Sequence, residues 1–284
     1  MCEYRSLEKV KLEVIYETFI EAFSDYQVKL DLSFIKFKNM MIRRGLVPEM
    51  SVGIFENDRL VGLILNGVRV WNGKMTVYDL GTGVIAEYRK RGLTGEALKV
   101  VKNLCREKGI ECYLLEVLQG NTGAVELYKK SGFEITREFD CYTLKKENIK
   151  NIKDIEVRKV EFFSDEQWEK IEKYCDYIPS WQNSADSIKA CSDKFCYYIV
   201  NVENDTAGYG IMEKITGDIP QIAVRKEYRN QGIGRSILNE MIKNIEGNQV
   251  KFLNVDCRDG GTKQFLLKTG AVKYVSQYEM ILEF

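Results

Sequence analysis

The 284-residue sequence contains no histidine. This absence removes the commonest general base, the usual partner of Ser and Cys nucleophiles, and the commonest zinc ligand. It excludes hydrolases built on a Ser-His or Cys-His pair and metalloenzymes with histidine ligands, and we predict no metal site. Any proton transfer has to use Asp, Glu, Tyr, Lys, Cys or ordered water.

Excess charge, proline and long apolar runs are also lacking. Lys plus Arg and Asp plus Glu both number 42, so no basic excess supports a nucleic-acid partner. Only three prolines are present, which argues against long disordered linkers. No apolar run is long enough to span a bilayer, and residues 1–11 are charged rather than apolar. We therefore expect a cytoplasmic protein with no membrane partner.

Eight cysteines are present, but none forms a Cys-x-x-Cys pair. Most lie in segments with apolar periodicity, where Cys behaves as a small hydrophobic residue. We expect reduced, structural thiols. The eight are Cys2, Cys105, Cys112, Cys141, Cys175, Cys191, Cys196 and Cys257.

The length favours two domains, at residues 1–146 and 147–284. Apolar periodicity, caps and turn residues predict an α+β fold with a mostly antiparallel twisted sheet in each half. In the first half the expected helices are Leu7–Phe23, Phe34–Arg44 (capped by Ser33, ended by Gly45), one after Gly92, and Thr122–Ser131. The expected strands are Met50–Phe55, Leu60–Val70, Met75–Ile85, Cys112–Leu118 and Phe133–Leu144.

The second half repeats this order after a polar stretch, Lys145–Asp154, which we predict to be the linker. Its expected helices are Asp165–Ile178, Ser184–Cys191, Gly232–Ile245 and a short one ended by Gly270. Its expected strands are Ile155–Val160, Phe195–Val202, Gln221–Val224, Val250–Cys257 and Lys273–Phe284, with a turn at Glu203-Asn204-Asp205. The glycines that begin the main helices are 140 residues apart (92 to 232), and those that end the short helices are 138 apart (132 to 270). Matching offsets favour a duplicated fold.

Two glycine-led segments between a strand and a helix carry the main functional signal. They read RKRGLTG at residues 89–95 and RNQGIGR at residues 229–235. Glycines let backbone N–H groups approach a ligand, and a helix N-terminus leaves donors unpaired and favours negative charge, so such a turn can bind phosphate. The alternative is a tight turn without a ligand. Neither segment fits a Walker loop or the Gly-x-Gly-x-x-Gly dinucleotide motif.

These segments resemble the pyrophosphate loop of the GNAT N-acetyltransferase superfamily, Arg/Gln-x-x-Gly-x-Gly/Ala. The second half matches in full at Arg229, Gly232 and Gly234, whereas the first half has Arg89 and Gly92 but Thr94 in the last position. Residues 121–133, NTGAVELYKKSGF, are similar to the family's fourth-helix signature. The two-copy arrangement resembles that of mycothiol synthases.

The resemblance implies acetyl-CoA as cofactor, bound by the two loops, by the splayed strand before each loop, and by Asn121, which we also expect to cap its helix. In the first half the implied binding residues are Gly83, Val84, Ile85, Arg89, Arg91, Gly92, Leu93, Thr94, Gly95 and Asn121. In the second half they are Ile222, Ala223, Val224, Arg229, Gln231, Gly232, Ile233, Gly234 and Arg235.

The resemblance further implies that Tyr128 is the general acid near the CoA sulfur, although by residue type alone a core tyrosine is the commoner outcome. The aligned position of the second half is Leu266, which cannot donate a proton. Glu116 and Asp79 are candidate general bases, or else charged side chains at strand ends. The first half is therefore the predicted catalytic copy and the second a binder of acetyl-CoA.

We accordingly expect an N-acetyltransferase that acts on a primary amine of a small molecule or peptide, as a monomer or homodimer. The alternative is a CoA-binding sensor or interaction module without turnover. A nucleotide-binding oxidoreductase is disfavoured because a long parallel βαβ pattern is missing. The segment Pro179–Ser184 either contacts a polar ligand or is a loop anchored by one buried Trp.

Overall fold

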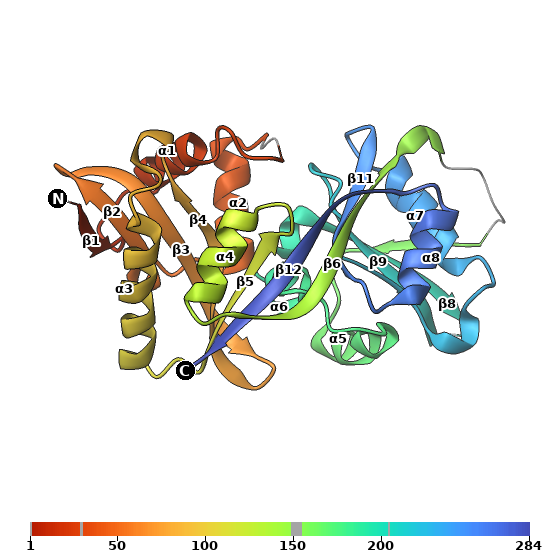
Figure 1. Ribbon diagram of the computed structural model, residues 1–284. Helices are drawn as coiled ribbons and strands as arrows, with labels where there is room; N and C mark the ends of the chain where they lie inside the picture. Colours follow the sequence, from red (N-terminus) through yellow and green to blue (C-terminus); the bar gives the residue numbers. More distant parts are fainter. Residues whose placement is uncertain (1, 29–30, 149–154, 204) are drawn as a thin grey trace. The chain divides into compact units, whose positions relative to one another are not determined.

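The computed structural model describes residues 2–28, 31–148, 155–203 and 205–284 (Figure 1). Its contacts form two compact units, unit 1 (Met1–Thr136 with Glu279–Phe284) and unit 2 (Arg137–Tyr278). Each unit is a mixed α+β fold, as predicted. The domain boundary at 146/147 stays a prediction. Of the predicted linker, residues 149–154 lie outside the described residues.

Unit 1 has the element order expected from the sequence, preceded by a short strand that the sequence analysis missed. Its helices are α1 (Leu12–Ala22), α2 (Phe34–Arg44), α3 (Leu93–Glu107) and α4 (Thr122–Lys130). Its strands are β1 (Glu3–Ser6), β2 (Val52–Glu56), β3 (Arg59–Trp71), β4 (Lys74–Val84), β5 (Cys112–Leu118) and the start of β6 (Glu134–Lys145). The last strand of the chain, β12 (Val272–Glu283), also ends in unit 1.

The sheet of unit 1 follows the order β1-β2-β3-β4-β5, and the end of β12 lies next to β5. The first four strands pair antiparallel, as the predicted meander requires. Lys74 of β4 forms an ion pair with Glu283, and the amide of Phe284 donates to the carbonyl of Glu111. Helix α3 packs on β2, β3 and β4, and α1 packs on β3 and β4 (Figure 1).

The caps of the helices follow the residue types read from the sequence. Ser33 accepts from the amide of Lys36 at the start of α2, and Gly45 ends that helix in the left-handed region at φ 77°. Asn121 accepts from the amide of Ala124 at the start of α4. These predictions are confirmed, because short-range hydrogen bonds decide them. The first helix begins at Leu12 instead of Leu7, since the amide of Leu7 still donates to the carbonyl of Ser51 beside β1 and the chain then makes a turn, with the amide of Val10 donating to the carbonyl of Leu7.

Strand β4 parts from β5 halfway along its length. The parallel pairing of the two strands covers Thr76–Tyr78 on β4, and β4 then continues to Val84 paired with β3. A register shift of the β3–β4 pairing leaves Leu80 as an extra residue, since Asn66 pairs with Asp79 and Leu65 with Gly81. Such a bulge changes which side chains share a face. The edge of β4 from Asp79 onwards is open toward β5, because the pairing of the two strands ends at Tyr78.

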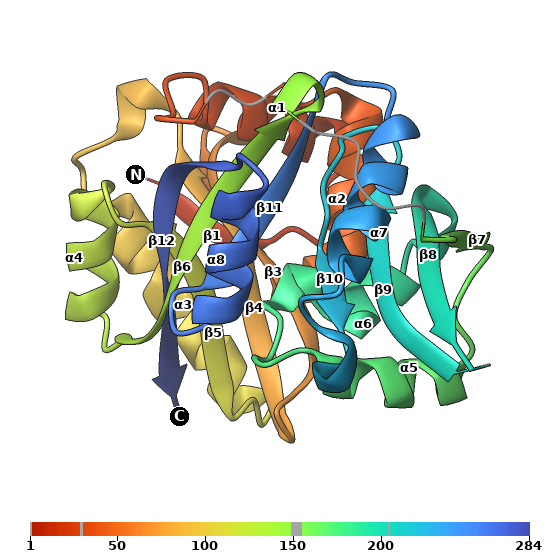
Figure 2. The ribbon, with the colours of Figure 1, turned by 90° about the vertical axis from the view of Figure 1, so that its right-hand side faces the viewer.

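Unit 2 repeats these elements. Its helices are α5 (Asp165–Ile171), α6 (Ala185–Lys189), α7 (Ile233–Lys243) and α8 (Gly260–Lys268). Its strands are the rest of β6, β7 (Arg158–Val160), β8 (Phe195–Val202), β9 (Asp205–Glu213), β10 (Gln221–Val224), β11 (Gln249–Asp256) and the start of β12. Helix α7 packs on β8, β9 and β10 (Figure 2).

In unit 2 the two strands that flank the opening belong to different sheets. Strands β10, β9, β8 and β7 form one antiparallel sheet, whereas β11 pairs with β6 in the other. A single parallel bridge, Asp218 with Lys251, stands where the pairing of β4 with β5 ends in unit 1. The splay expected from the sequence is therefore present in both units.

Several predicted elements of unit 2 are shorter than expected. The helix predicted over Asp165–Ile178 is α5 followed by a 3₁₀ turn that ends at Tyr174, and the strand predicted over Ile155–Val160 is β7. Asn204 of the predicted turn lies outside the described residues. All eight cysteines are free thiols. Across the described ranges, no helix combines the length and the apolar character that crossing a bilayer demands.

Candidate functional site

Both glycine-led segments end in a helix whose N-terminus has no side-chain cap. Gly92 precedes α3 at φ 76°, and Gly232 precedes α7 at φ 98°. Two residues earlier, Lys90 and Asn230 both have φ 61°. The two turns thus share an unusual backbone that glycine makes possible. Without a capping side chain, the first amides of each helix remain available to an anion.

Arg89 holds the loop of unit 1 in place. Its Nε donates to the carbonyl of Val84 at 2.9 Å, and its Nη2 donates to the carbonyl of Ala22 at 2.8 Å. Both terminal nitrogens also donate to the carboxylate of Asp25, at 2.6 and 2.7 Å. These hydrogen bonds keep the pKa of Asp25 below its ordinary value. The guanidinium therefore links α1 and the following loop to the end of β4.

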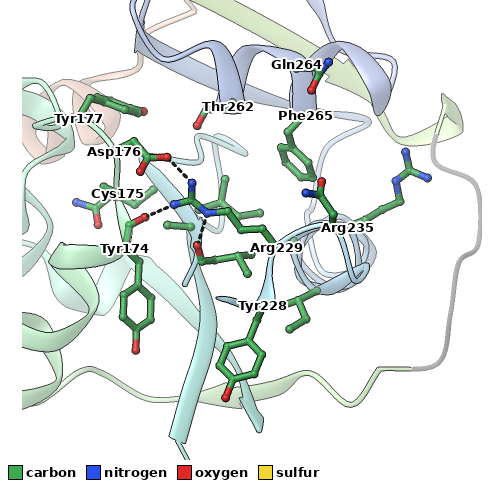
Figure 3. A pocket seen from close by; sticks show the side chains of 18 of the residues that line it. Tyr174, Cys175, Asp176, Tyr177, Tyr228, Arg229, Arg235, Thr262, Gln264 and Phe265 are labelled. Atoms are coloured by element: carbon green, nitrogen blue, oxygen red, sulfur yellow. Dashed lines mark hydrogen bonds and ion pairs between the residues drawn. The ribbon is translucent and has the colours of Figure 1, made fainter. Parts of the chain in front are cut away.

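Arg229 makes the corresponding contacts in unit 2, with one terminal nitrogen instead of two on the carboxylate. Its Nε donates to the carbonyl of Val224 at 2.9 Å, its Nη1 to Asp176 at 2.6 Å and its Nη2 to the carbonyl of Tyr174 at 3.0 Å. Figure 3 shows Asp176 and Tyr174 converging on this guanidinium. The two arginines are 140 residues apart and have equivalent partners, which supports the duplicated fold. A cofactor contact for Arg89 and Arg229 stays a prediction.

The hydrogen bonds of Arg89 and Arg229 also show which residues of the two open strands, β4 and β10, correspond to each other. Since Arg89 contacts Val84 and Arg229 contacts Val224, Ile85 corresponds to Arg225. The amides of Ile85 and Arg225 both donate to the neighbouring strand, at Val61 and Ala207. The predicted set in unit 1 is therefore one residue further along than the set in unit 2. Ile85 is buried and is not part of the lining of the unit 1 cavity.

Unit 1 contains a cavity of about 490 Å³ between α1, the open edge of β4, the loop and α4. Six of the predicted site residues line it: Gly83, Val84, Arg89, Thr94, Asn121 and Tyr128. Arg91, Gly92, Leu93 and Gly95 lie in the adjoining turn and are not part of its lining. Arg91 stacks over Tyr88 and donates to the carbonyl of Glu87. Thr82, Tyr26 and Asp25 are lining residues that the sequence analysis missed.

Unit 2 contains the corresponding cavity, of about 540 Å³ (Figure 3). Its lining includes every predicted residue of this half except Gln231, namely Ile222, Ala223, Val224, Arg229, Gly232, Ile233, Gly234 and Arg235. Figure 3 shows Tyr177 and Phe265 on opposite sides of Arg229. Gln231 donates to the carbonyl of Glu227, which repeats the contact of Arg91 in unit 1. Tyr174–Tyr177, Thr262 and Phe265 were missed by the sequence analysis.

Tyr128 and Asp79 meet at the wall of the unit 1 cavity. The Tyr128 hydroxyl donates to Oδ2 of Asp79 at 3.3 Å, and Oγ1 of Thr82 donates to the same oxygen at 2.6 Å. Thr82 is three residues beyond Asp79 and shares its face because of the bulge at Leu80. Oδ1 of Asp79 is buried without a hydrogen-bond partner. Tyr128 and Thr82 line the cavity, whereas Asp79 lies behind them.

Burial dominates the electrostatics of this pair. It raises the pKa of Asp79 to about 6, against the opposing effect of its hydrogen bonds with Thr82, the backbone and Tyr128. Burial and the nearby Asp79 carboxylate raise the pKa of Tyr128 well above its ordinary value. At neutral pH the pair is therefore mostly an ionised carboxylate and a neutral phenol.

This pKa shift predicts how stability depends on pH. Because the folded state raises the pKa of Asp79 from 3.8 to about 6, its contribution to stability is full below the unfolded value and is lost as the pH rises through about 6. Relative to Asp79→Asn, the wild type should lose on the order of 3 kcal/mol between about pH 4 and about pH 7. Urea unfolding of both proteins at the two pH values measures this. Parallel pH dependence of the two proteins would contradict the prediction.

Glu116, the other candidate base, lies on β5 and hydrogen-bonds with Tyr78. It is not part of the lining of the unit 1 cavity. The structure therefore joins Asp79 to the predicted acid Tyr128 and places Glu116 in a separate pair.

The corresponding wall of unit 2 differs. Leu266 is 0% exposed within the core. The segment Ser180–Asn183 is buried, and Trp181 is 0% exposed and does not line the cavity, so of the two alternatives for this segment the structure shows the anchored loop. Asn183 donates to the carbonyl of Leu253 on β11 and accepts from Gln221 on β10, thereby bridging the two splayed strands. This loop fills the splay beyond the cavity.

Family comparisons agree with the two units. A model described as "Acetyltransferase (GNAT) family" matches residues 12–133, and one described as "Acetyltransferase (GNAT) domain" matches residues 193–270. N-alpha-acetyltransferase 50 of Danio rerio is 31% identical over 90 residues, which cover 31% of this chain and 54% of the relative. The chain thus spans about half the length of the curated relatives it matches.

Solved structures match over the whole chain. A GCN5-related N-acetyltransferase from Sphaerobacter thermophilus is 13% identical with a TM-score of 0.74, covering 99% of this chain and 95% of its own. A tandem GNAT protein from the clavulanic acid biosynthesis pathway is 11% identical with a TM-score of 0.73, covering 100% and 98%. At these identities the likeness concerns the fold, which in the second case is also a tandem.

Proposed function

The chain belongs to the acetyltransferase (GNAT) family, with two GNAT domains in tandem, and from this membership we propose that it transfers the acetyl group of acetyl-CoA to a primary amine in unit 1. The observation that carries the proposal is the placement of Tyr128. Its hydroxyl-bearing side chain lines the same cavity as Thr94 of the glycine-led loop and the open edge of β4. A binding turn, a free strand edge and a proton donor therefore surround one space.

The residues present fit acetyl-CoA. The uncapped amides at the start of α3, at Leu93, Thr94 and Gly95, would hold its diphosphate, and the open edge at Gly83 and Val84 would hold its pantetheine arm. Bound there, acetyl-CoA supplies an activated acetyl thioester. Arg89 keeps the loop and the strand end in register, and Asn121 keeps α4 in place beside them.

Unit 2 offers the same binding elements without the same chemistry. The start of α7 is uncapped, and its amides at Ile233, Gly234 and Arg235 border a cavity of about 540 Å³. Leu266 stands where unit 1 has Tyr128, and the Ser180–Asn183 loop bridges β10 and β11. We propose that unit 2 binds acetyl-CoA and does not transfer acetyl groups.

The acceptor is a primary amine of a small molecule or a peptide. The name of the zebrafish relative, an N-alpha-acetyltransferase, favours an α-amino group. A neutral amine has to lose one proton as the amide forms, and Asp79 and Glu116 are the carboxylates of unit 1 proposed to assist. The prediction of a cytoplasmic protein, monomeric or homodimeric, stays as it is.

Release of free thiol from acetyl-CoA tests the function. The protein is incubated with acetyl-CoA and glycinamide, ethanolamine or a tetra-alanine peptide with a free amino terminus, and the CoA thiol and the acetylated amine are measured. Amine-dependent release of both supports the enzyme. Tight binding of acetyl-CoA by calorimetry with no product from any amine supports the alternative, a non-catalytic CoA-binding sensor or interaction module. Absence of binding contradicts both.

Calorimetry should also show two binding sites for acetyl-CoA. Gly92→Ala and Gly232→Ala place a Cβ on a residue at positive φ, which strains each turn by about 1 kcal/mol or more. Each variant is expected to weaken one of two sites by about fivefold or more. Gly109→Ala is the matched control, because Gly109 has φ 67° and open space but lies at the far end of α3. One site that Gly232→Ala leaves intact would contradict binding by unit 2.

A further inference from the structure

The direction of one hydrogen bond bears on how protons move in the unit 1 cavity. An ionised carboxylate can only accept hydrogen bonds, so Tyr128 has to donate its phenolic proton to Oδ2 of Asp79. The proton of Tyr128 therefore lies on the side away from the cavity. The lone pairs of the Tyr128 oxygen are not used in this hydrogen bond, and the side chain that carries them lines the cavity. In this state Tyr128 is set up to accept a proton before it donates one.

Asp79 has no route of its own to a substrate. The residue is 8% exposed, and its Oδ1 is buried without a hydrogen-bond partner. Its Oδ2 is covered by Tyr128 and Thr82, the two residues that separate it from the cavity. A proton that reaches Asp79 has to arrive and leave through one of these two hydroxyls, and a phenol such as that of Tyr128 is a far stronger acid than the aliphatic alcohol of Thr82. The unpaired oxygen also leaves the carboxylate poorly solvated, which favours proton uptake.

We propose that Tyr128 performs both proton transfers of the reaction, accepting the proton that the amine loses and later donating one to the CoA sulfur, with Asp79 storing the proton in between. This inference rests on the proposed acetyl transfer in unit 1. It replaces two independent groups, a base and an acid, with one side chain and a store behind it. Asp79 thereby acts through Tyr128, as a positioning and proton-storing residue.

The transfers balance. As the C–N bond forms, a proton passes from the amine nitrogen to Oη of Tyr128, and the phenolic proton passes to Oδ2 of Asp79. As the C–S bond breaks, Asp79 returns its proton to Oη, and Tyr128 donates its proton to the departing sulfur. One proton has moved from nitrogen to sulfur. Tyr128 ends as a phenol and Asp79 as a carboxylate, ready for the next turnover.

Other titratable and charged groups face Asp79 from the elements around it. Arg44 of α2 favours its ionised form. The Asp79 carboxylate contributes to raising the pKa of three nearby phenols, those of Tyr26, Tyr78 on β4 and Tyr113 on β5. Tyr113 donates to Asn66 and is buried, and Tyr78 pairs with Glu116. Of these phenols, Tyr26 shares the cavity lining with Tyr128, whereas the hydrogen bond to Asp79 comes from Tyr128.

A double-mutant cycle distinguishes the relay from separate groups. Tyr128→Phe and Asp79→Asn should each slow acetyl transfer by about 100-fold or more, and the double variant should be no slower than the slower single variant. If the two losses multiply, or if Asp79→Asn stays within about twofold of the wild type, the relay is wrong. If Glu116→Gln loses as much as Asp79→Asn and multiplies with Tyr128→Phe, a separate base operates and the relay is likewise wrong. The amine is the most active of glycinamide, ethanolamine and tetra-alanine.

Two readouts separate this role from a structural one. The rate should rise with pH through about 6, where Asp79 ionises, and Asp79→Asn should remove this limb. Carbon-13 NMR of aspartate-labelled protein should show the pKa of Asp79 rising in Tyr128→Phe, because the ionised form loses a hydrogen-bond donor. An unchanged pKa in Tyr128→Phe would show that the two side chains are not coupled, and the relay would fall.

The chain supplies a matched control pair. In unit 2 the hydroxyl of Tyr142 donates to Oδ2 of Asp140 at 3.2 Å, and neither residue lines a cavity of the two units described above. Tyr142→Phe and Asp140→Asn should leave acetyl transfer unchanged. If wild-type protein acetylates none of the three amines, the proposed function fails. If it acetylates an amine but the cycle is multiplicative, the relay alone fails.

Discussion

Tyr128→Phe is expected to reduce acetyl transfer by about 100-fold or more while acetyl-CoA still binds. The substitution removes one hydroxyl from a residue that is 7% exposed and lines the unit 1 cavity. The phenyl ring keeps the packing against Phe133, whose ring centroid lies 5.6 Å away. A loss confined to the rate constant would therefore report the missing proton transfer.

Steady-state kinetics with acetyl-CoA and the best amine measures the effect, and calorimetry with acetyl-CoA measures binding. We expect kcat to fall and the dissociation constants of both sites to stay within about threefold. A variant that transfers acetyl at the wild-type rate would remove Tyr128 from the mechanism. A variant that loses both binding and turnover would mean that the hydroxyl holds the cavity together.

Local features of the fold were predictable from the sequence. The segments Phe34–Arg44, Cys112–Leu118 and Phe195–Val202 match α2, β5 and β8 residue for residue. Each is bounded by a capping residue, a glycine or a clear change of period, and such signals act over a few residues. The glycine-led turns were predictable for the same reason.

Contacts between distant residues were not predictable. Asp25 lies 64 residues from Arg89, and Tyr128 lies 49 residues from Asp79. The second pair depends on an extra residue at Leu80. The pattern of apolar and polar residues in Met75–Ile85 does not predict such a bulge. The end of β12 lies in unit 1 rather than unit 2, which was likewise not predictable. A strand pattern specifies which faces are apolar but not which strand lies alongside.

In the candidate site, too, the local features were predictable and the contacts between distant residues were not. Residues of the glycine-led turns were identified because a ligand class requires that backbone. Tyr128 was identified from a motif, whereas its hydrogen bond with Asp79 appears only in the folded chain. The hydrogen bonds of Arg89 and Arg229 show why the motif contains an arginine before the glycine. That side chain holds the strand end and the preceding helix region together.

Trp181→Ala is expected to destabilise unit 2 by about 3–5 kcal/mol. Trp181 is 0% exposed, and its carbonyl accepts from Ser184 at 2.8 Å and from Ser187 at 2.6 Å. Its side chain anchors the loop from which Asn183 bridges β10 and β11. Removing the fully buried indole leaves a large void in unit 2, and a void of this kind costs contacts that the surroundings regain only in part.

Denaturant unfolding in a Trp71→Phe background measures this, because the remaining tryptophans, Trp168 and Trp181, both belong to unit 2. In Trp181→Ala, the fluorescence of Trp168 alone then reports unit 2. Trp181→Phe is the matched control and should lose far less, since a ring still fills most of the site. If Trp181→Ala unfolds at the control's midpoint, the loop is held by its hydrogen bonds instead. In that case the closure of the splay in unit 2 depends on Asn183 and Gln221, and the same experiment on Asn183→Ala should show the larger loss.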